Sequence, residues 1–211
     1  SRKDALDTPC LIVDRDILER NMEIARDAVR ASGKLLRPHA KTHKCSEIAR
    51  MQIERGAVGV CAAKVSEAEA LARTGIRNIL VTGPVSDRNK VSRLLDIRES
   101  DTRLLTVIDS IETAELAGAE AKRRGLVLDV LVDIDVGLGR TGVHPDRAGE
   151  LAARLSNLAS LRLRGIQAYA GQVQHIPGSD ARRDASVTVM RRAAEIFRQV
   201  RTEFGCDIFT G

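Results

Sequence analysis

The feature of this sequence that most constrains its fold is a regular alternation of short apolar runs and amphipathic segments. After a first apolar run at 10–14, seven more follow along the chain, at 34–41, 57–63, 78–83, 103–109, 128–135, 161–169 and 206–211. Between the runs, apolar residues recur at three- and four-residue spacing, at 15–32, 46–55, 65–74, 87–97, 111–124, 146–157 and 183–204. Near-continuous apolar strands that alternate with helices are typical of a parallel sheet buried on both faces.

Seven strands with six intervening helices predict an α/β fold, a (β/α)8 TIM-type barrel that stops one unit short of closure. A doubly wound open sheet is the alternative. If the barrel is correct, we expect the 211 residues to be part of a longer protein. Active sites of barrels lie at the carboxyl ends of the strands, so the polar residues at those positions are the candidates for function.

Composition argues against several classes of function. The net charge is +5, but acidic residues are interleaved with the basic ones, and aromatic residues make up 2% of the chain. Stacking platforms for nucleic acid are therefore scarce. The sequence contains no run of 18 or more apolar residues, and its N-terminus lacks the apolar run of a signal peptide. Four scattered cysteines are typical of reduced thiols. We expect a cytoplasmic protein with no nucleic-acid or membrane partner.

Two lysines lie in the segment 36–49, LRPHAKTHKCSEIA, at the end of an expected strand. With a strand period of two, His39 and Lys41 share one face, and the amine of Lys41 can rise into a barrel mouth. Lys44 follows at the turn into the next helix, where a lysine is more often solvated. Nearby cations lower the pKa of an amine and favour its use as a nucleophile. Because His39, His43 and Lys44 surround it, Lys41 is the better candidate; a basic loop end without chemistry is the alternative.

A loop at 132–145 reads VDIDVGLGRTGVHP and has three glycines at the spacing G-x-G-x-x-G, namely Gly137, Gly139 and Gly142. This spacing is the fingerprint of a dinucleotide site. Here, however, it lies mid-chain, a His-Pro pair separates it from the next helix, and no acidic residue ends the next strand. Asp135 and Arg140 carry more weight, because a fixed guanidinium can hold a phenolate or carboxylate oxygen. An Arg–Asp pair that braces a glycine turn is the alternative.

The segment 167–175, QAYAGQVQH, contains the single tyrosine of the chain. Tyr169 falls at a strand end, where a phenol can donate to a bound ring or stack beside it. His175 follows with Gln172 in a loop that can act as a lid over a site. A simply solvent-exposed histidine is the alternative.

Six stretches of the chain resemble one family in their order and spacing: LDTPCLIVD, RPHAKTHKCSEIA, GVCAAKVSEAEAL, VDIDVGLGRTGV, GIQAYAGQVQH and DIFTG. The family is that of the D-threonine aldolases and their relatives. These are pyridoxal-phosphate enzymes with the alanine-racemase-like fold, and they include D-serine dehydratases and D-3-hydroxyaspartate aldolases. The resemblance spans the whole chain; the PHAKTHK block is specific, whereas GLGRTG alone would be weak.

The resemblance implies roles for five residues. Lys41 matches the lysine that forms a Schiff base with pyridoxal phosphate, and Arg140 matches the arginine that contacts the ring hydroxyl of this cofactor. Tyr169 matches an active-site tyrosine near the ring, and His39 is expected close to the cofactor. Gly211 would be the first residue of the glycine-rich loop that binds the phosphate.

The resemblance also implies parts of the protein outside these 211 residues. A last barrel unit and a C-terminal β-domain would follow, and that domain would carry the ligands of an activating divalent metal, so we expect no metal site in this chain. Residues 1–14 would form a leading strand that belongs with the β-domain, and residues 15–211 would form the cofactor-binding barrel.

As to activity, the resemblance implies a lyase that cleaves D-β-hydroxy-α-amino acids of the D-threonine type to glycine and an aldehyde. The QVQH run is more similar to the aldolase branch than to the dehydratase branch. Alternatives are a D-serine or D-3-hydroxyaspartate dehydratase, a non-catalytic pyridoxal-phosphate carrier, and a nucleotide-dependent oxidoreductase. A small D-amino acid substrate and a homodimer are expected on the same ground.

Overall fold

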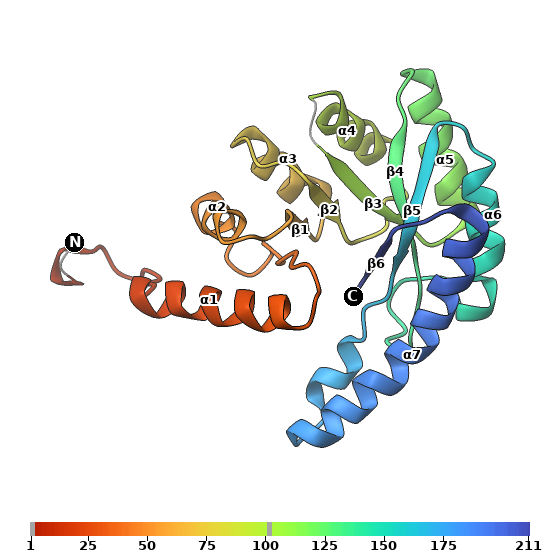
Figure 1. Cartoon of the computed structure of the whole chain (residues 1–211). Coiled ribbons are helices and arrows are strands. Elements are labelled where there is room, and N and C mark those ends of the chain that lie inside the picture. Colours follow the sequence, from red (N-terminus) through yellow and green to blue (C-terminus); the bar gives the residue numbers. More distant parts are fainter. Residues whose placement is uncertain (1–2, 101–102) are drawn as a thin grey trace.

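The computed structural model describes residues 3–100 and 103–211 and contains a parallel sheet of six strands (Figure 1). The strands are β1 (Val60–Ala62), β2 (Ile79–Val81), β3 (Leu104–Ile108), β4 (Leu128–Asp133), β5 (Leu161–Gln167) and β6 (Ile208–Thr210). The α-helices are α1 (Arg15–Ala31), α2 (Ser46–Glu54), α3 (Val65–Arg73), α4 (Arg88–Glu99), α5 (Ile111–Arg123), α6 (Ala148–Ser156) and α7 (Ser179–Phe204). Short 3-10 turns lie at η1 (Lys3–Ala5), η2 (Pro145–Arg147) and η3 (Gly171–His175).

Each strand pairs in parallel with the next strand along the chain, so the sheet order is β1-β2-β3-β4-β5-β6. Figure 1 shows a curled sheet with the helices that connect its strands on the outer side. A doubly wound sheet would reverse its strand order and carry helices on both faces. The prediction of an incomplete (β/α)8-type barrel is therefore confirmed, and the doubly wound alternative is wrong.

The strands bury side chains on both faces of the sheet. The outer face packs against the helices in the main core, which includes Ile79, Val130 and Ile166, all fully buried. The inner face forms a smaller apolar cluster of Cys61, Leu80, Leu105, Val107 and Leu131. Burial of each large aliphatic side chain stabilises the fold by roughly 1.5–3 kcal/mol, so the two-sided burial accounts for the near-continuous apolar runs.

The segment 34–41 was expected as a regular strand, and here the structure differs. It runs beside β1 but forms an isolated parallel bridge, between His39 and Cys61. The Cys61 N–H donates to the Pro38 carbonyl at 2.8 Å, and the Ala40 N–H donates to the Cys61 carbonyl at 2.9 Å. Pro38 has no N–H to offer a ladder, which shortens the regular pairing.

The N-terminal segment extends away from the sheet (Figure 1). Helix α1 begins after Asp14, whose carboxylate accepts the Ile17 N–H at 3.0 Å as an N-cap. In the described part of the chain, residues 10–14 pair with no strand, and Leu11, Ile12 and Val13 are exposed. Pairing of this segment with a further domain stays a prediction.

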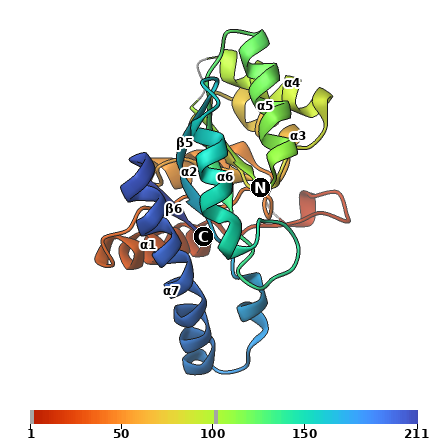
Figure 2. The same cartoon turned by 90° about the vertical axis from the view of Figure 1, so that its right-hand side faces the viewer.

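Two other boundaries differ from the expectation. Helix α7 begins at Ser179, before the expected start at 183, and extends well beyond the sheet (Figure 2). The segment expected as one helix at 146–157 is divided between η2 and α6. Within the described residues, no helix has the length and apolarity needed to span a membrane.

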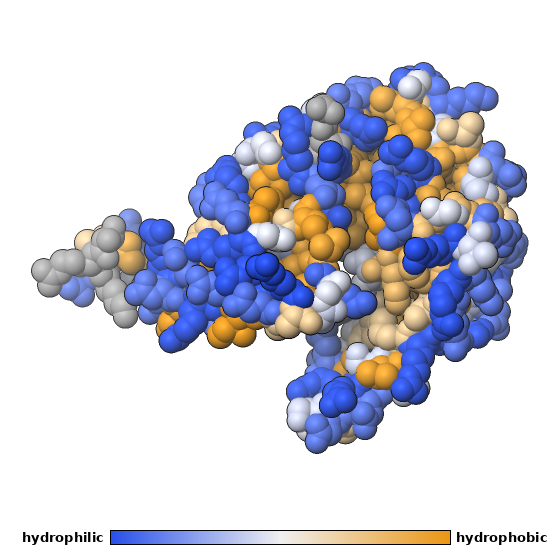
Figure 3. Space-filling view, viewed as in Figure 1, coloured by the Kyte–Doolittle hydropathy of each residue, from blue (hydrophilic) through white to orange (hydrophobic). Residues whose placement is uncertain are grey.

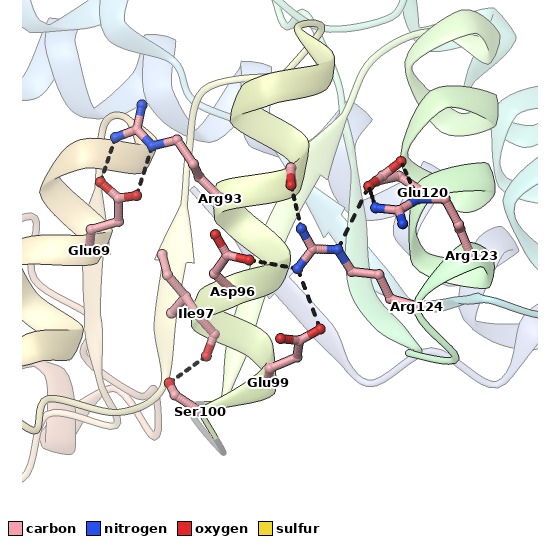
Figure 4. A network of polar contacts seen from close by, with 10 residues as sticks. Glu69, Arg93, Asp96, Ile97, Glu99, Ser100, Glu120, Arg123 and Arg124 are labelled. Carbon is pink, nitrogen blue, oxygen red and sulfur yellow. Dashed lines mark hydrogen bonds and ion pairs between the residues drawn. The ribbon is translucent and has the colours of Figure 1, made fainter.

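Ion pairs connect the outer helices α3, α4 and α5 (Figure 4). Arg124, at the end of α5, donates to Asp96 at 2.6 Å and to the Ser92 hydroxyl, both on α4. Glu120, one turn earlier, accepts from Arg123 and lies 3.7 Å from Arg124. Because the side chain of Arg124 is 14% exposed, its partners replace most of its hydration. The network thus holds neighbouring helices in register over the sheet.

Gly165 marks a close approach between β5 and β6, next to an irregularity in the β4–β5 pairing. Its φ is +145°, and a Cβ there would lie 1.8 Å from the carbonyl oxygen of Ile208. We expect Gly165→Ala to lower the free energy of unfolding by about 2–4 kcal/mol, because the backbones must separate. Urea unfolding of the intact protein measures this change.

Gly149→Ala is the matched control, since a Cβ at this helical position meets nothing within 4 Å. Alanine should stabilise α6 by about 0.5–1 kcal/mol. Equal effects of the two substitutions would contradict the close approach at Gly165.

Candidate active site

A cavity of about 190 Å³ lies at the carboxyl ends of the strands. Figure 3 shows apolar surface over the strands between more hydrophilic helices. The cavity is lined by Arg37, His39, Lys41, Cys61, Leu80, Thr82, Arg140, Gln167, Tyr169, Thr210 and Gly211. The lining residues come from segments far apart in the sequence, and five of them are the predicted Lys41, His39, Arg140, Tyr169 and Gly211.

The structure separates the two lysines of the PHAKTHK block. Lys41 lines the cavity, with its Nζ 5.8 Å from the centroid of the Tyr169 ring. Lys44 adopts a left-handed backbone conformation, and its Nζ forms a 3.0 Å ion pair with Glu67 at the start of α3. Of the two lysines, Lys41 therefore lines the cavity and Lys44 pairs with Glu67; a catalytic role for Lys41 stays a prediction.

Arg140 and Lys41 converge on the same aromatic ring. The Arg140 Cζ lies 5.4 Å from the centroid of Tyr169, which places two cations near one π-system. The phenol oxygen of Tyr169 accepts a hydrogen bond from Gln174 Nε2 at 2.9 Å. In the described part of the chain no carboxylate lines the cavity, so its cations favour an anionic ligand.

Asp135 braces the glycine loop that carries Arg140. Its Oδ1 accepts the N–H groups of Gly137 at 2.9 Å and of Gly139 at 3.0 Å. These backbone hydrogen bonds, the Gly139 bond foremost, lower the pKa of Asp135. The amides that would bind phosphate in a dinucleotide site thus hold the loop's own carboxylate, which argues against that alternative. Asp135 thus stabilises the turn by accepting hydrogen bonds from backbone amides. The guanidinium of Arg140 lies beside the ring of Tyr169.

His39 is held as a neutral ring. The backbone N–H of Lys41 donates to its Nδ1 at 3.2 Å, so the proton of the neutral imidazole lies on Nε2, which is 3.2 Å from the Thr82 hydroxyl. Burial, followed by the charge of Lys41, lowers the pKa of His39 to about 4. At neutral pH the side chain therefore offers a flat uncharged surface and no free basic nitrogen.

Beneath the lysine, Cys61 and Arg37 line the floor of the cavity. Burial raises the pKa of the Cys61 thiol to about 11, so the sulfur stays protonated. Arg37 donates to the backbone and side-chain oxygens of Asn78 at 2.7 and 2.9 Å. Burial lowers the pKa of Arg37, whose guanidinium nevertheless stays charged in proteins.

Gln172 and His175, predicted as lid residues, lie in η3 outside the cavity lining. Gln172 Nε2 donates to the Val136 carbonyl at 2.9 Å and so ties η3 to the glycine loop. His175 is exposed. Neither side chain touches the cavity in this conformation.

The structure adds polar residues that were not among the predicted site residues. Gln167 and Thr82 line the cavity, and Asp133 lies buried behind them. Gln167 precedes Tyr169 by two residues, and Asp133 precedes Asp135 by two. Strand periodicity could therefore have placed each on the inward face.

The lining fits the cofactor that the resemblance implies. An amine, a planar guanidinium, a phenol and a neutral imidazole surround one space, which suits a flat anionic aldehyde. A Cβ at Gly211 would lie 2.2 Å from the Ala168 carbonyl oxygen, so the backbone passes close to this wall. Among the described residues, no group of three or more His, Cys, Asp or Glu side chains could hold a metal ion.

Comparison with known proteins finds relatives over most of the chain. Residues 13–208 match the family described as alanine racemase, N-terminal domain. The 3-hydroxy-D-aspartate aldolase of Paracoccus denitrificans (strain Pd 1222) is 37% identical over 195 residues, which cover 90% of this chain and 50% of that protein. The chain spans about half the length of the curated relatives it matches.

Two solved structures are similar over most of the chain. The D-threonine aldolase from Filomicrobium marinum has a TM-score of 0.89 and 37% identity, covering 93% of this chain and 53% of that one. The D-threo-3-hydroxyaspartate dehydratase from Delftia sp. HT23 has a TM-score of 0.82 and 27% identity, covering 96% and 54%. A mutant of such a dehydratase has been solved in a form described as metal-free.

The lowered pKa of His39 predicts a dependence of stability on pH. The unfolded chain binds a proton at this histidine below about pH 6.5, whereas the folded protein binds it at about pH 4. Its contribution to stability is therefore complete above pH 6.5 and is lost as the pH falls towards 4. His39→Gln should lose less stability between pH 7 and pH 5 than the wild type, as measured by urea unfolding.

His144→Gln, at an exposed loop position, is the control and should follow the wild type. An unchanged pH dependence in His39→Gln would show that the imidazole is not held in its neutral form.

Proposed function

The chain belongs to the alanine racemase N-terminal domain family, and on that premise we propose that it is the pyridoxal-phosphate-binding barrel of a lyase acting on D-β-hydroxy-α-amino acids. The observation that carries the proposal is the convergence of Lys41 and Arg140 on the ring of Tyr169, at 5.8 and 5.4 Å. A primary amine beside a planar cation and a phenol suits a cofactor that has an aldehyde and a ring hydroxyl. The names of the related aldolases and dehydratases support the reaction class.

Five of the lining residues have a role in this proposal. Lys41 would hold the cofactor through its amine, and the guanidinium of Arg140 would donate to the ring hydroxyl of the cofactor. The neutral ring of His39 would pack against the cofactor, and Tyr169 lies beside Lys41. The backbone at Gly211 would lie close to the phosphate. When bound, pyridoxal phosphate supplies an electron sink for the bond that breaks at the substrate α-carbon.

Within the reaction class, we propose cleavage of the Cα–Cβ bond of D-threonine-type substrates to glycine and an aldehyde. Relatives at 37% identity are named aldolases, whereas the similar dehydratase structure is 27% identical. The QVQH run at 172–175 supports the same branch. Dehydration of D-serine or D-3-hydroxyaspartate is the competing outcome, and a non-catalytic cofactor carrier is another.

We further propose that the intact protein is a cytoplasmic homodimer activated by a divalent metal ion. The description of a related dehydratase as metal-free supports metal binding in the family. The dimer and the compartment rest on the resemblance and on the pattern of scattered cysteines in the sequence.

Reduction with borohydride tests the assignment of Lys41. The intact protein loaded with pyridoxal phosphate should lose its visible absorption band on reduction, and peptide mapping should find the label on Lys41. Lys41→Ala should abolish both the band and the label. Lys44→Ala is the matched control and should retain both, because Lys44 is paired with Glu67. A label on Lys44 would contradict the assignment.

A substrate panel tests the reaction. The intact protein, with pyridoxal phosphate and a divalent metal, should release glycine and an aldehyde from D-threonine. Release of ammonia and a keto acid from D-serine or D-3-hydroxyaspartate would favour the dehydratase alternative. Bound cofactor without turnover of any of the three would favour the carrier.

For Arg140→Lys, which keeps the charge but loses the planar donor, we expect a fall in kcat/KM of about 10-fold or more.

A further inference from the structure

A chain of buried and partly buried polar groups runs along the wall of the cavity, with Asp133 at its centre. Asp133 is the last residue of β4, and it is 3% exposed. Its Oδ1 accepts from Gln167 Nε2 at 2.8 Å, and its Oδ2 accepts from the Thr141 hydroxyl at 3.0 Å. Each carboxylate oxygen therefore holds a group from a different element.

One arm of the chain reaches His39. Gln167 Nε2 donates to the Thr82 carbonyl at 3.1 Å as well as to Asp133, so both of its protons are used. If the Gln167 amide were turned over, its oxygen would face two other acceptor oxygens, the carboxylate of Asp133 and the carbonyl of Thr82. These two acceptors therefore determine the orientation of the amide. The hydroxyl of Thr82 is 3.2 Å from His39 Nε2. Asp133 is thus connected to the wall of the cavity beside Lys41.

The other arm reaches the loop that carries Arg140. Thr141, whose hydroxyl binds Asp133, follows Arg140 directly in the sequence. Burial raises the pKa of Asp133, while the bonds from Gln167 and Thr141 and the charge of Arg140 favour its ionised form. A buried carboxylate that accepts from two donors fixes the positions of both donor groups, because a buried donor without a partner costs free energy.

We propose that Asp133 is a positioning residue of this pocket: by holding Gln167 and Thr141, it sets the place of His39 on one side and of Arg140 on the other. Asp133 does not line the cavity, and it acts through groups that do. The proposal rests on the proposed function for the identity of the ligand, but the hydrogen-bond chain is tested without it.

Three variants of the intact protein test the proposal. Asp133→Leu removes both acceptors and keeps a side chain that branches at Cγ. In Asp133→Asn, the side-chain oxygen still accepts from Gln167 and the amide donates to the Thr141 hydroxyl, which reverses its direction. Asp129→Asn is the matched control: the same substitution at the start of the same strand, where the carboxylate binds Arg162 and Arg164 away from the cavity.

The first measurement is the affinity for pyridoxal phosphate by absorbance titration. We expect Asp133→Leu to raise Kd about 10-fold or more, and we expect Asp133→Asn and Asp129→Asn to remain close to the wild type. Wild-type affinity in Asp133→Leu would overturn the proposal. An equal loss in Asp133→Asn would overturn it as well, because the charge and not the hydrogen bonds would then matter. If Asp133→Leu fails to fold, Thr141→Val replaces it and should raise Kd about threefold.

The second measurement needs no cofactor. With ¹⁵N-labelled histidine, assigned by His39→Gln, the wild type and Asp133→Asn should show His39 as the neutral tautomer with its proton on Nε2. In Asp133→Leu these resonances should shift or broaden, and no change would overturn the role. If the wild type binds no pyridoxal phosphate, the proposed function fails, and the NMR comparison still decides whether Asp133 positions His39.

Discussion

Parallel pairing of β1 through β6 directs the carboxyl ends of all six strands to one side of the molecule. The pairing is stable because apolar side chains are buried on both faces, against the helices outside and in a smaller cluster inside. The interiors of the strands are mostly apolar, so the polar residues gather near the ends of the strands. Tyr169 follows β5 and Lys41 follows the isolated bridge beside β1, so these two distant residues come together there.

Burial also sets the charges of the site. Lys41 and Arg140 line the cavity as basic side chains, while the pKa shifts of His39 and Cys61 keep both of these side chains neutral near pH 7. The site therefore separates groups that attract an anion from groups that offer an uncharged surface. A flat anionic ligand bound through an amine matches both properties, which is why the geometry and the family agree.

Periodicity was a good guide wherever one face of a strand decides the outcome. It placed His39 and Lys41 on a common face and distinguished Lys41 from Lys44 before any contact was known. It was less successful at 34–41, where Pro38 limits the regular pairing, and at the start of α7. Periodicity also did not predict that the N–H groups of Gly137 and Gly139 donate to Asp135. The path of a loop depends on hydrogen bonds formed inside the loop, which have no regular period.

The sequence by itself determined the class of fold, the order of the elements and the strand ends near which the polar residues of the cavity lie, because these follow from local periodicity and from the chain's own order. Tertiary structure alone decided which polar residues meet. The bonds that join Asp133 to Gln167 and Thr82 to His39 span 34 and 43 positions of the chain. Such contacts depend on the curvature of the sheet and on what each buried group finds opposite it, and no local pattern encodes either.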